Sequence, residues 1–87
     1  MINNRLKTSD IFSTHELSLS AALVSWGFPL NCIDKTNPSR VVFIFMRTPE
    51  LDNYIQSFWD NSGKISPKTY FNALREVKSR IYEGGTW

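Results

Sequence analysis

Several residue types that catalysis depends on are scarce in this sequence. The 87 residues include one cysteine, Cys32, and one histidine, His15, which excludes an internal disulfide and a cysteine-based zinc site. The four glycines stand at predicted helix ends, and none belongs to a glycine-rich phosphate loop. Because no nucleophile with a base, paired carboxylates or metal cluster stands out, we expect no enzyme, no catalytic residue, no metal and no cofactor.

Long apolar runs are absent as well. No stretch approaches the roughly 18 residues that a membrane span needs, and no basic start leads into the apolar segment of a signal peptide. A lone cysteine fits a reducing compartment, and we predict that Cys32 is a small buried residue of a strand. We therefore expect a cytoplasmic protein with no membrane partner.

Aromatic residues are plentiful by contrast. They make up 14% of the chain, and hydrophobic residues in total make up 41%. This composition is typical of globular proteins and not of disordered ones. At this length the chain is predicted to form one domain, residues 1–87, with a core that is only just large enough. We expect residues 1–10 and 84–87 to be loosely ordered.

Residues 41–46 form an unbroken apolar run, V-V-F-I-F-M, which predicts a strand. Because side chains alternate along a strand, Phe43 and Phe45 face away from Val42 and Ile44. Both faces are apolar, so helices of this chain or a partner must cover each of them. We expect this strand to pair antiparallel with residues 30–35 across a turn of about four residues.

Three helices are predicted from their start signals and from apolar residues spaced three and four apart. The start signals are a capping box from Ser13 to Glu16, Thr48 with Pro49, and Ser66 with Pro67, and the stop signals are Gly27, Gly63, Gly84 and Gly85. With residues 11–12 as a short edge strand, the order is (β)αββαα. The predicted fold is a small, single α+β domain in which an antiparallel hairpin packs against three helices.

The predicted helices differ in their apolar faces. The first is apolar on two sides, which indicates a buried helix or an interface. The second and third each have one apolar face, formed by Leu51, Tyr54, Ile55, Phe58 and Trp59 and by Tyr70, Phe71, Leu74, Val77 and Ile81.

Basic residues are concentrated near the end of the chain. The net charge is +2, and residues 61–87 carry five basic residues against two acidic ones. Basic and amide side chains opposite the apolar face of the third helix are of the types that contact phosphates and base edges. The predicted nucleic-acid-binding residues are Lys64, Lys68, Asn72, Arg75, Lys78 and Arg80. Glu76 interrupts this face, and an ordinary solvated helix has a similar composition.

Another set of features favours a protein interaction. The hairpin has open edges, its second strand is apolar on both faces, and the first helix is apolar on two sides. This hypothesis predicts a homodimer or the binding of a host protein through the hairpin and the first helix. Three helices could instead satisfy these surfaces within one molecule.

Residues 12–23 read F-S-T-H-E-L-S-L-S-A-A-L and are followed by Gly27-Phe28. This stretch resembles an uncharacterised family of short bacterial, archaeal and phage proteins with the pattern F-x-T-x-D-L-x-L-A-A-x-L and a following G-F. The family also has a V-V-F-x-F strand, an E-L helix ending in F-W and a closing Y-F-x-A helix, which correspond to residues 41–45, 50–59 and 70–82 here. Glu16 and Ser20 replace the usual Asp and Ala.

The family is a domain of unknown function, so the resemblance implies no activity, cofactor or catalytic residue. It implies a context, because such proteins look like cargo of phages and other mobile elements, which commonly bind nucleic acid or inhibit a host protein. Our leading hypothesis is a non-enzymatic accessory protein that binds DNA or RNA through its third helix. The alternative is the protein-interaction module.

Overall fold

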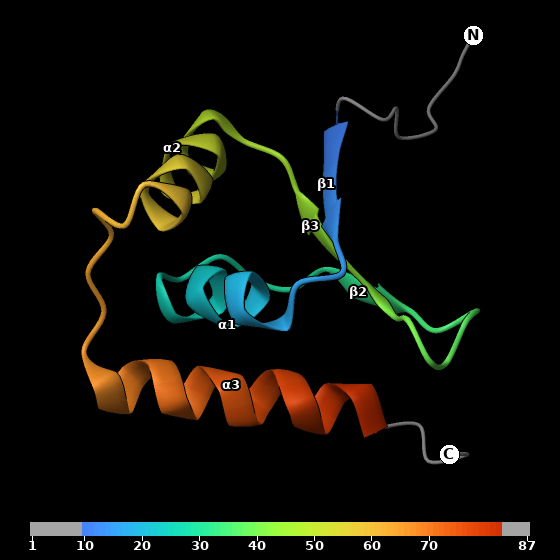
Figure 1. The fold of residues 1–87 in the computed structure, drawn as a ribbon. Helices are drawn as coiled ribbons and strands as arrows, with labels where there is room; N and C mark the ends of the chain where they lie inside the picture. The colour runs from blue at the N-terminus through green and yellow to red at the C-terminus, as the bar shows by residue number, and fades with distance from the viewer. Residues whose placement is uncertain (1–9, 83–87) are drawn as a thin grey trace, which may run out of the picture.

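A computed structural model describes residues 10–82 of the chain (Figure 1). Three strands and three helices follow one another in the predicted order, and the α+β class is confirmed. The elements are β1 (Ile11–Thr14), α1 (Leu17–Ser25), β2 (Cys32–Asp34), β3 (Val42–Met46), α2 (Pro49–Trp59) and α3 (Pro67–Tyr82). Residues 1–9 and 83–87 lie outside the described residues, and with them Gly84, Gly85 and almost all of the ends that were predicted to be loosely ordered.

The sheet is organised around β3, which is its central strand. The strand order is β1-β3-β2, and both pairings are antiparallel. β1 is longer than the two residues predicted, and it pairs Phe12 with Phe45 and Thr14 with Phe43. The hairpin of β2 and β3 is confirmed, with Ile33 opposite Phe43.

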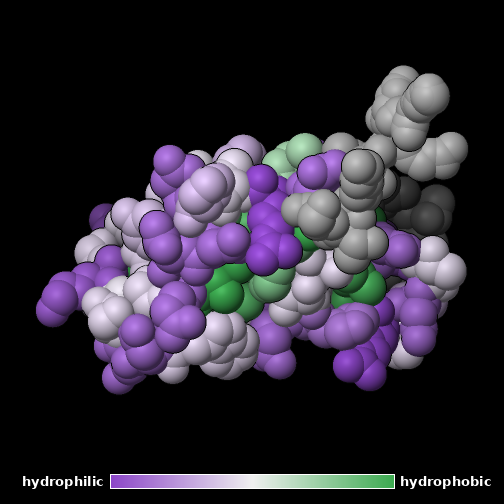
Figure 2. Space-filling view, turned by 90° about the horizontal axis from the view of Figure 1, so that it is seen from above, coloured by the Kyte–Doolittle hydropathy of each residue, from purple (hydrophilic) through white to green (hydrophobic). Residues whose placement is uncertain are grey.

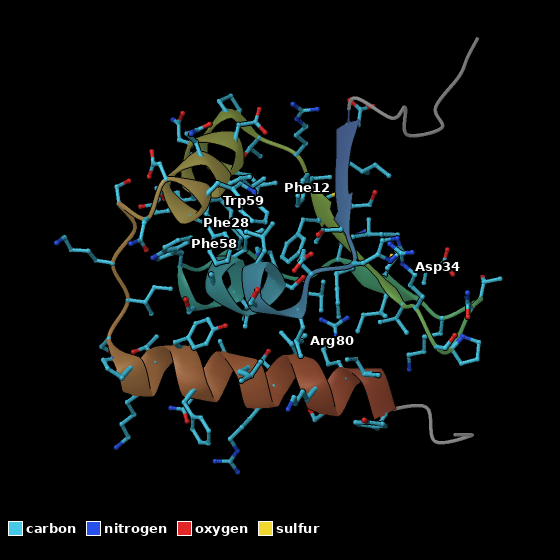
Figure 3. All side chains as sticks on the ribbon, in the orientation of Figure 1. Phe12, Phe28, Asp34, Phe58, Trp59 and Arg80 are labelled. Carbon is cyan, nitrogen blue, oxygen red and sulfur yellow. The ribbon has the colours of Figure 1, made fainter. Side chains whose placement is uncertain are left out.

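The two faces of β3 have different surroundings. Phe43 and Phe45 are buried, at 1% and 0% exposure, whereas Val42 and Ile44 are half-buried and Met46 is 45% exposed. Figure 1 shows the three helices gathered on one side of the sheet, and Figure 3 shows Phe12 pointing to that same side. Within residues 10–82, the helices therefore cover only one face of the strand.

α1 lies at the centre of the molecule, between α2 and α3 (Figure 1). Its two apolar sides are both used inside the chain, because consecutive residues around the helix are buried. These are Leu19, Ser20, Ala21, Ala22 and Leu23, each at 1% exposure or less. The small residues permit close approach of the backbone of α3, where Ala73 is also buried.

The start of α1 differs from the prediction. Ser13 is part of β1 and cannot cap the helix, so the predicted capping box is wrong. The N-cap residue is Glu16 without a side-chain cap, and its backbone N–H donates to Thr14 Oγ1 at 3.0 Å. The helix end is as predicted, since Gly27 has a φ of 102° and its N–H donates to the carbonyl of Val24.

The lone cysteine is a second correction. Cys32 pairs with Ile44, so its side chain lies on the sheet face that the helices leave uncovered. β2 is also shorter than predicted and forms an edge of the sheet. Cys32 is accordingly exposed and not a buried core residue.

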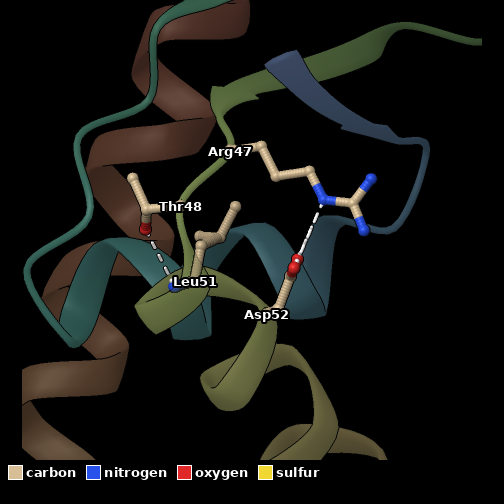
Figure 4. Close-up of polar contacts among 4 residues, drawn as sticks. All are labelled: Arg47, Thr48, Leu51 and Asp52. Carbon is tan, nitrogen blue, oxygen red and sulfur yellow. Dashed lines mark hydrogen bonds and ion pairs between the residues drawn. The ribbon is translucent and has the colours of Figure 1, made fainter. Parts of the chain in front are cut away.

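α2 begins as its sequence predicts. Thr48 Oγ1 accepts a hydrogen bond from the N–H of Leu51 at 3.0 Å, and Pro49 occupies the first turn (Figure 4). Leu51 is fully buried, but Trp59 is 60% exposed and lies outside the core. Beyond the helix, Asn61 has a left-handed conformation, with φ 66°, within the stretch Asn61-Ser62-Gly63 that was predicted to end α2.

Hydrophilic side chains cover most of the upper face, on the side of α2, with hydrophobic side chains visible between them (Figure 2). In residues 10–82, no helix has both the length and the apolar character needed to cross a membrane.

Candidate nucleic-acid interface

α3 forms one outer layer of the molecule and is anchored along its inner side. Ala73 and Val77 are buried against the core, at 5% and 1% exposure. Near its start, the hydroxyl of Tyr70 donates to the carbonyl of Ser18, with 3.3 Å between the oxygens. These contacts fix the rotation of the helix, so the residues half a turn away from Val77 face solvent.

Most of the predicted site residues lie on that outer face. Lys68, Asn72 and Arg75 are exposed and lie on the side of α3 opposite Val77, and the exposed Lys78 flanks that side. The structure brings these four side chains to one part of the molecular surface, as the sequence predicts.

Lys64 belongs to the same end of the molecule but not to the helix. It lies in the connection between α2 and α3, and its side chain is exposed. Its backbone is held in place, because the Nε1 of Trp26 donates to the carbonyl of Lys64 at 3.0 Å. Lys64 therefore flanks the start of α3 from a fixed loop.

Arg80 has a different position. Its guanidinium points inwards from α3 towards the chain before β2 (Figure 3), and its Nη1 donates to the carbonyl of Leu30 at 2.9 Å. The residue is half-buried. The prediction that Arg80 flanks the outer face is therefore wrong, because its helical position lies closer to Val77 than to Lys68.

Phe71 was assigned to the buried stripe, and this was also wrong. It is 56% exposed, and the guanidinium carbon of Arg75 lies 5.8 Å from the centre of its ring. The core position that the prediction missed is Ala73. The sequence contained a signal for the outer position of Phe71, because Lys68, Phe71, Arg75 and Lys78 are spaced three, four and three residues apart.

The outer face of α3 is positive. Within residues 10–82, no carboxylate forms an ion pair with Lys64, Lys68, Arg75 or Lys78; the ion pair recorded there joins Arg47 to Asp52. Glu76 lies on α3 to one side of the lysines. Uncompensated cations on one face create a field that attracts polyanions.

The carboxylates with perturbed pKa values lie away from α3. Hydrogen bonds from Thr36 lower the pKa of Asp34, and hydrogen bonds from Ser62 lower the pKa of Asp60. Both side chains are fully exposed and are stabilised as anions by their own turns. These shifts belong to turn structure and define no acid–base pair.

Two other places could hold chemistry. Between the end of α2 and the start of α3 is a hollow of about 410 Å³, lined by aromatic and small residues with Tyr70 as the one titratable side chain. His15 is exposed, and its Nδ1 donates to the carbonyl of Val41. Among the described residues, no group of three or more His, Cys, Asp or Glu side chains could hold a metal ion.

The alternative surface is smaller than predicted. In residues 10–82, α1 lies between α2 and α3, and its apolar residues are buried or half-buried there. The uncovered sheet face consists of side chains from all three strands, namely Ile11, Ser13, Cys32, Asp34, Val42, Ile44 and Met46. This face, and not α1, is the surface on which a protein-interaction hypothesis rests.

The fold and the site together define a small α+β domain with one cationic outer helix. Comparison with protein families matches residues 9–83 to a domain of unknown function, DUF5659, and the chain belongs to this family. The resemblance to an uncharacterised family is thereby confirmed. Comparisons with curated proteins and with solved structures found no match.

Proposed function

We propose that this protein binds nucleic acid through the outer face of α3 and has no enzymatic activity. The observation that carries the proposal is the set of exposed cations along one side of the helix, Lys68, Arg75 and Lys78, without carboxylate partners in residues 10–82. Lys64 extends the set beyond the helix start. Phosphate contacts of this kind dominate the affinity of proteins for nucleic acid.

The inner side of α3 supports the same proposal. A rigid helix holds its cations in a fixed line, and both of its ends are tied to the core by Tyr70 and Arg80. Within residues 10–82, the buried residues of α3 are Ala73 and Val77, so the three cations are not part of the core. An accessory role in a phage or mobile element is part of this proposal and rests on the family context alone.

The test is a triple variant, Lys68→Ala with Arg75→Ala and Lys78→Ala, measured for retention on immobilised DNA and RNA. We expect it to lose retention while keeping its circular dichroism spectrum. The matched control replaces three cations elsewhere, Lys35, Arg40 and Arg47, with Ala and so has the same net charge. Equal retention by the two variants would remove the proposal.

The open sheet face favours a second candidate function, the formation of a homodimer. Its centre is formed by uncharged residues, so two copies can meet across a two-fold axis without like-charge repulsion. This candidate predicts that the solution mass is that of a dimer, and that Met46→Lys with Ile44→Thr yields a monomer. A wild-type protein that is monomeric at every concentration would contradict it, and Phe71→Leu is the control that leaves the mass unchanged.

A further inference from the structure

Two exposed aromatic side chains lie on the cationic side of α3. Phe71 is 56% exposed and Tyr82 is 65% exposed, although both are large hydrophobic residues. Exposed rings on a helix whose opposite side already supplies the core contribute little to burial. Their position beside the cations makes both rings accessible to a molecule that binds this side of α3.

The rings and the cations form one stripe. Lys68, Phe71, Arg75, Lys78 and Tyr82 follow one another at intervals of three, four, three and four residues. Residues at these intervals lie along the same side of an α-helix. Three cations and two rings thus share one stripe, which is about 21 Å long at 1.5 Å per residue.

The two rings can stack only on bases whose flat faces are accessible. Phe71 and Tyr82 are separated by about 16 Å along the helix axis, at 1.5 Å per residue. Bases in a duplex are stacked on one another, so their flat faces are not accessible to a protein ring. An unpaired strand exposes these faces, and proteins that bind single strands combine aromatic platforms with a cationic track.

Arg75 adds a further contact to this arrangement. Its guanidinium lies 5.8 Å from the centre of the Phe71 ring, which is the range of a cation–π interaction. The ring therefore orients a charge that would otherwise be free to turn. A base on Phe71 and a phosphate on Arg75 would then be bound side by side.

We infer that α3 binds single-stranded nucleic acid in preference to duplex, with Phe71 and Tyr82 stacking on bases and Lys68, Arg75 and Lys78 contacting phosphates. This inference rests on the proposed function and names its substrate class. A protein partner could also use such a stripe, and the experiment separates the two.

The experiment measures fluorescence anisotropy of a labelled oligothymidylate and of a blunt-ended duplex of equal length, each titrated with the full chain. We expect tighter binding of the single strand. Phe71→Leu and Tyr82→Leu keep the charge and the apolar character but remove the rings. Each substitution should weaken single-strand binding about tenfold, as loss of base–aromatic stacking does, and leave duplex binding unchanged.

Trp59→Leu is the matched control. Trp59 is 60% exposed, much like Phe71, but it belongs to α2, on the other side of α1 from α3 (Figures 1 and 3). We expect this variant to bind both oligonucleotides as the wild type does. All three substituted side chains are exposed, so the circular dichroism spectra should remain those of the folded protein.

The outcomes are distinguishable. Equal affinity for single strand and duplex, unchanged by Phe71→Leu and Tyr82→Leu, overturns the inference and leaves the proposed function standing. Failure to bind either oligonucleotide overturns both. In a third outcome, the wild type binds no oligonucleotide but captures a protein even after nuclease treatment, and the two leucine variants do not capture it. This result would assign the stripe to a protein partner and also overturn the inference.

Discussion

Arg80 donates a hydrogen bond from Nη1 to the carbonyl oxygen of Leu30, across 2.9 Å, and so ties α3 to the chain that precedes β2. Leu30 is buried at 7% exposure, so its carbonyl has little access to water as an alternative partner. The cation therefore has a structural role, in contrast to the exposed cations on the same helix.

Replacement of Arg80 should separate stability from binding. Arg80→Ala leaves a poorly solvated carbonyl without its donor, and we expect the free energy of unfolding to fall by about 1–3 kcal/mol. Urea denaturation followed by circular dichroism measures this change. Lys78→Ala is the control on the same helix, because Lys78 is exposed and should change stability by less than about 0.5 kcal/mol. A stability loss for Lys78→Ala as large as that for Arg80→Ala would contradict this division.

Gly63 is constrained by the ring of Trp26. A Cβ at position 63 would lie 2.6 Å from Cζ2 and 2.7 Å from Cη2 of that ring, so one of the two segments would have to move. We expect Gly63→Ala to destabilise the protein by about 1–3 kcal/mol, as overpacking does. Lys64→Ala is the neighbouring control, because the Lys64 side chain is exposed and only its backbone carbonyl contacts Trp26. If Gly63→Ala unfolds at the same urea concentration as the wild type, the close packing of Trp26 on this loop is wrong.

The first turn of α2 offers a test of capping against ion pairing (Figure 4). Thr48→Ala removes the acceptor for the Leu51 N–H and should cost about 1 kcal/mol, whereas Thr48→Ser keeps it. Arg47→Ala removes the exposed pair with Asp52 and should change stability by less than about 0.5 kcal/mol, because surface pairs contribute little. Thermal unfolding of the three variants ranks the effects, and a larger loss for Arg47→Ala would reverse the ranking.

The pKa of Asp34 provides a test at the hairpin. The Thr36 hydroxyl and backbone N–H both donate to Asp34 Oδ1, at 2.6 Å and 2.9 Å, and lower the pKa of this carboxyl. A lowered folded-state pKa means that the contribution to stability is present above the ordinary pKa of aspartate and is lost as the pH falls through the folded value. Thr36→Ala should raise the pKa of Asp34 towards its ordinary value in an NMR titration. An unchanged titration midpoint would contradict the role of the hydroxyl.

Local signals predicted much of this fold. The helix ends at Thr48 with Pro49, at Ser66 with Pro67 and at Gly27 were predicted because their geometry depends on near neighbours in the sequence. Ser13 was misassigned as a cap for a tertiary reason, since pairing with Ile44 places it in the sheet. Cys32 was misassigned for the same reason, because the covered face of the sheet is fixed by packing and not by composition.

The candidate site was predicted less completely than the fold. Lys68, Asn72, Arg75 and Lys78 follow from helix periodicity once Val77 marks the buried side. Periodicity could also have placed Phe71 on the outer side with Lys68 and Arg75, but it could not place Arg80, which lies near the boundary of the buried stripe. The position of the Arg80 guanidinium depends on the carbonyl of Leu30, which is distant in the sequence.

The salt dependence of single-strand binding tests the central claim most directly. If Lys68, Arg75 and Lys78 each neutralise a phosphate, the logarithm of the association constant should fall linearly with the logarithm of the salt concentration, with a slope of about −2. The variant that lacks these three cations should show a much shallower slope, and Arg80→Ala should keep the wild-type slope. A wild-type affinity that is insensitive to salt, or a triple variant with the wild-type slope, would contradict nucleic-acid binding through α3.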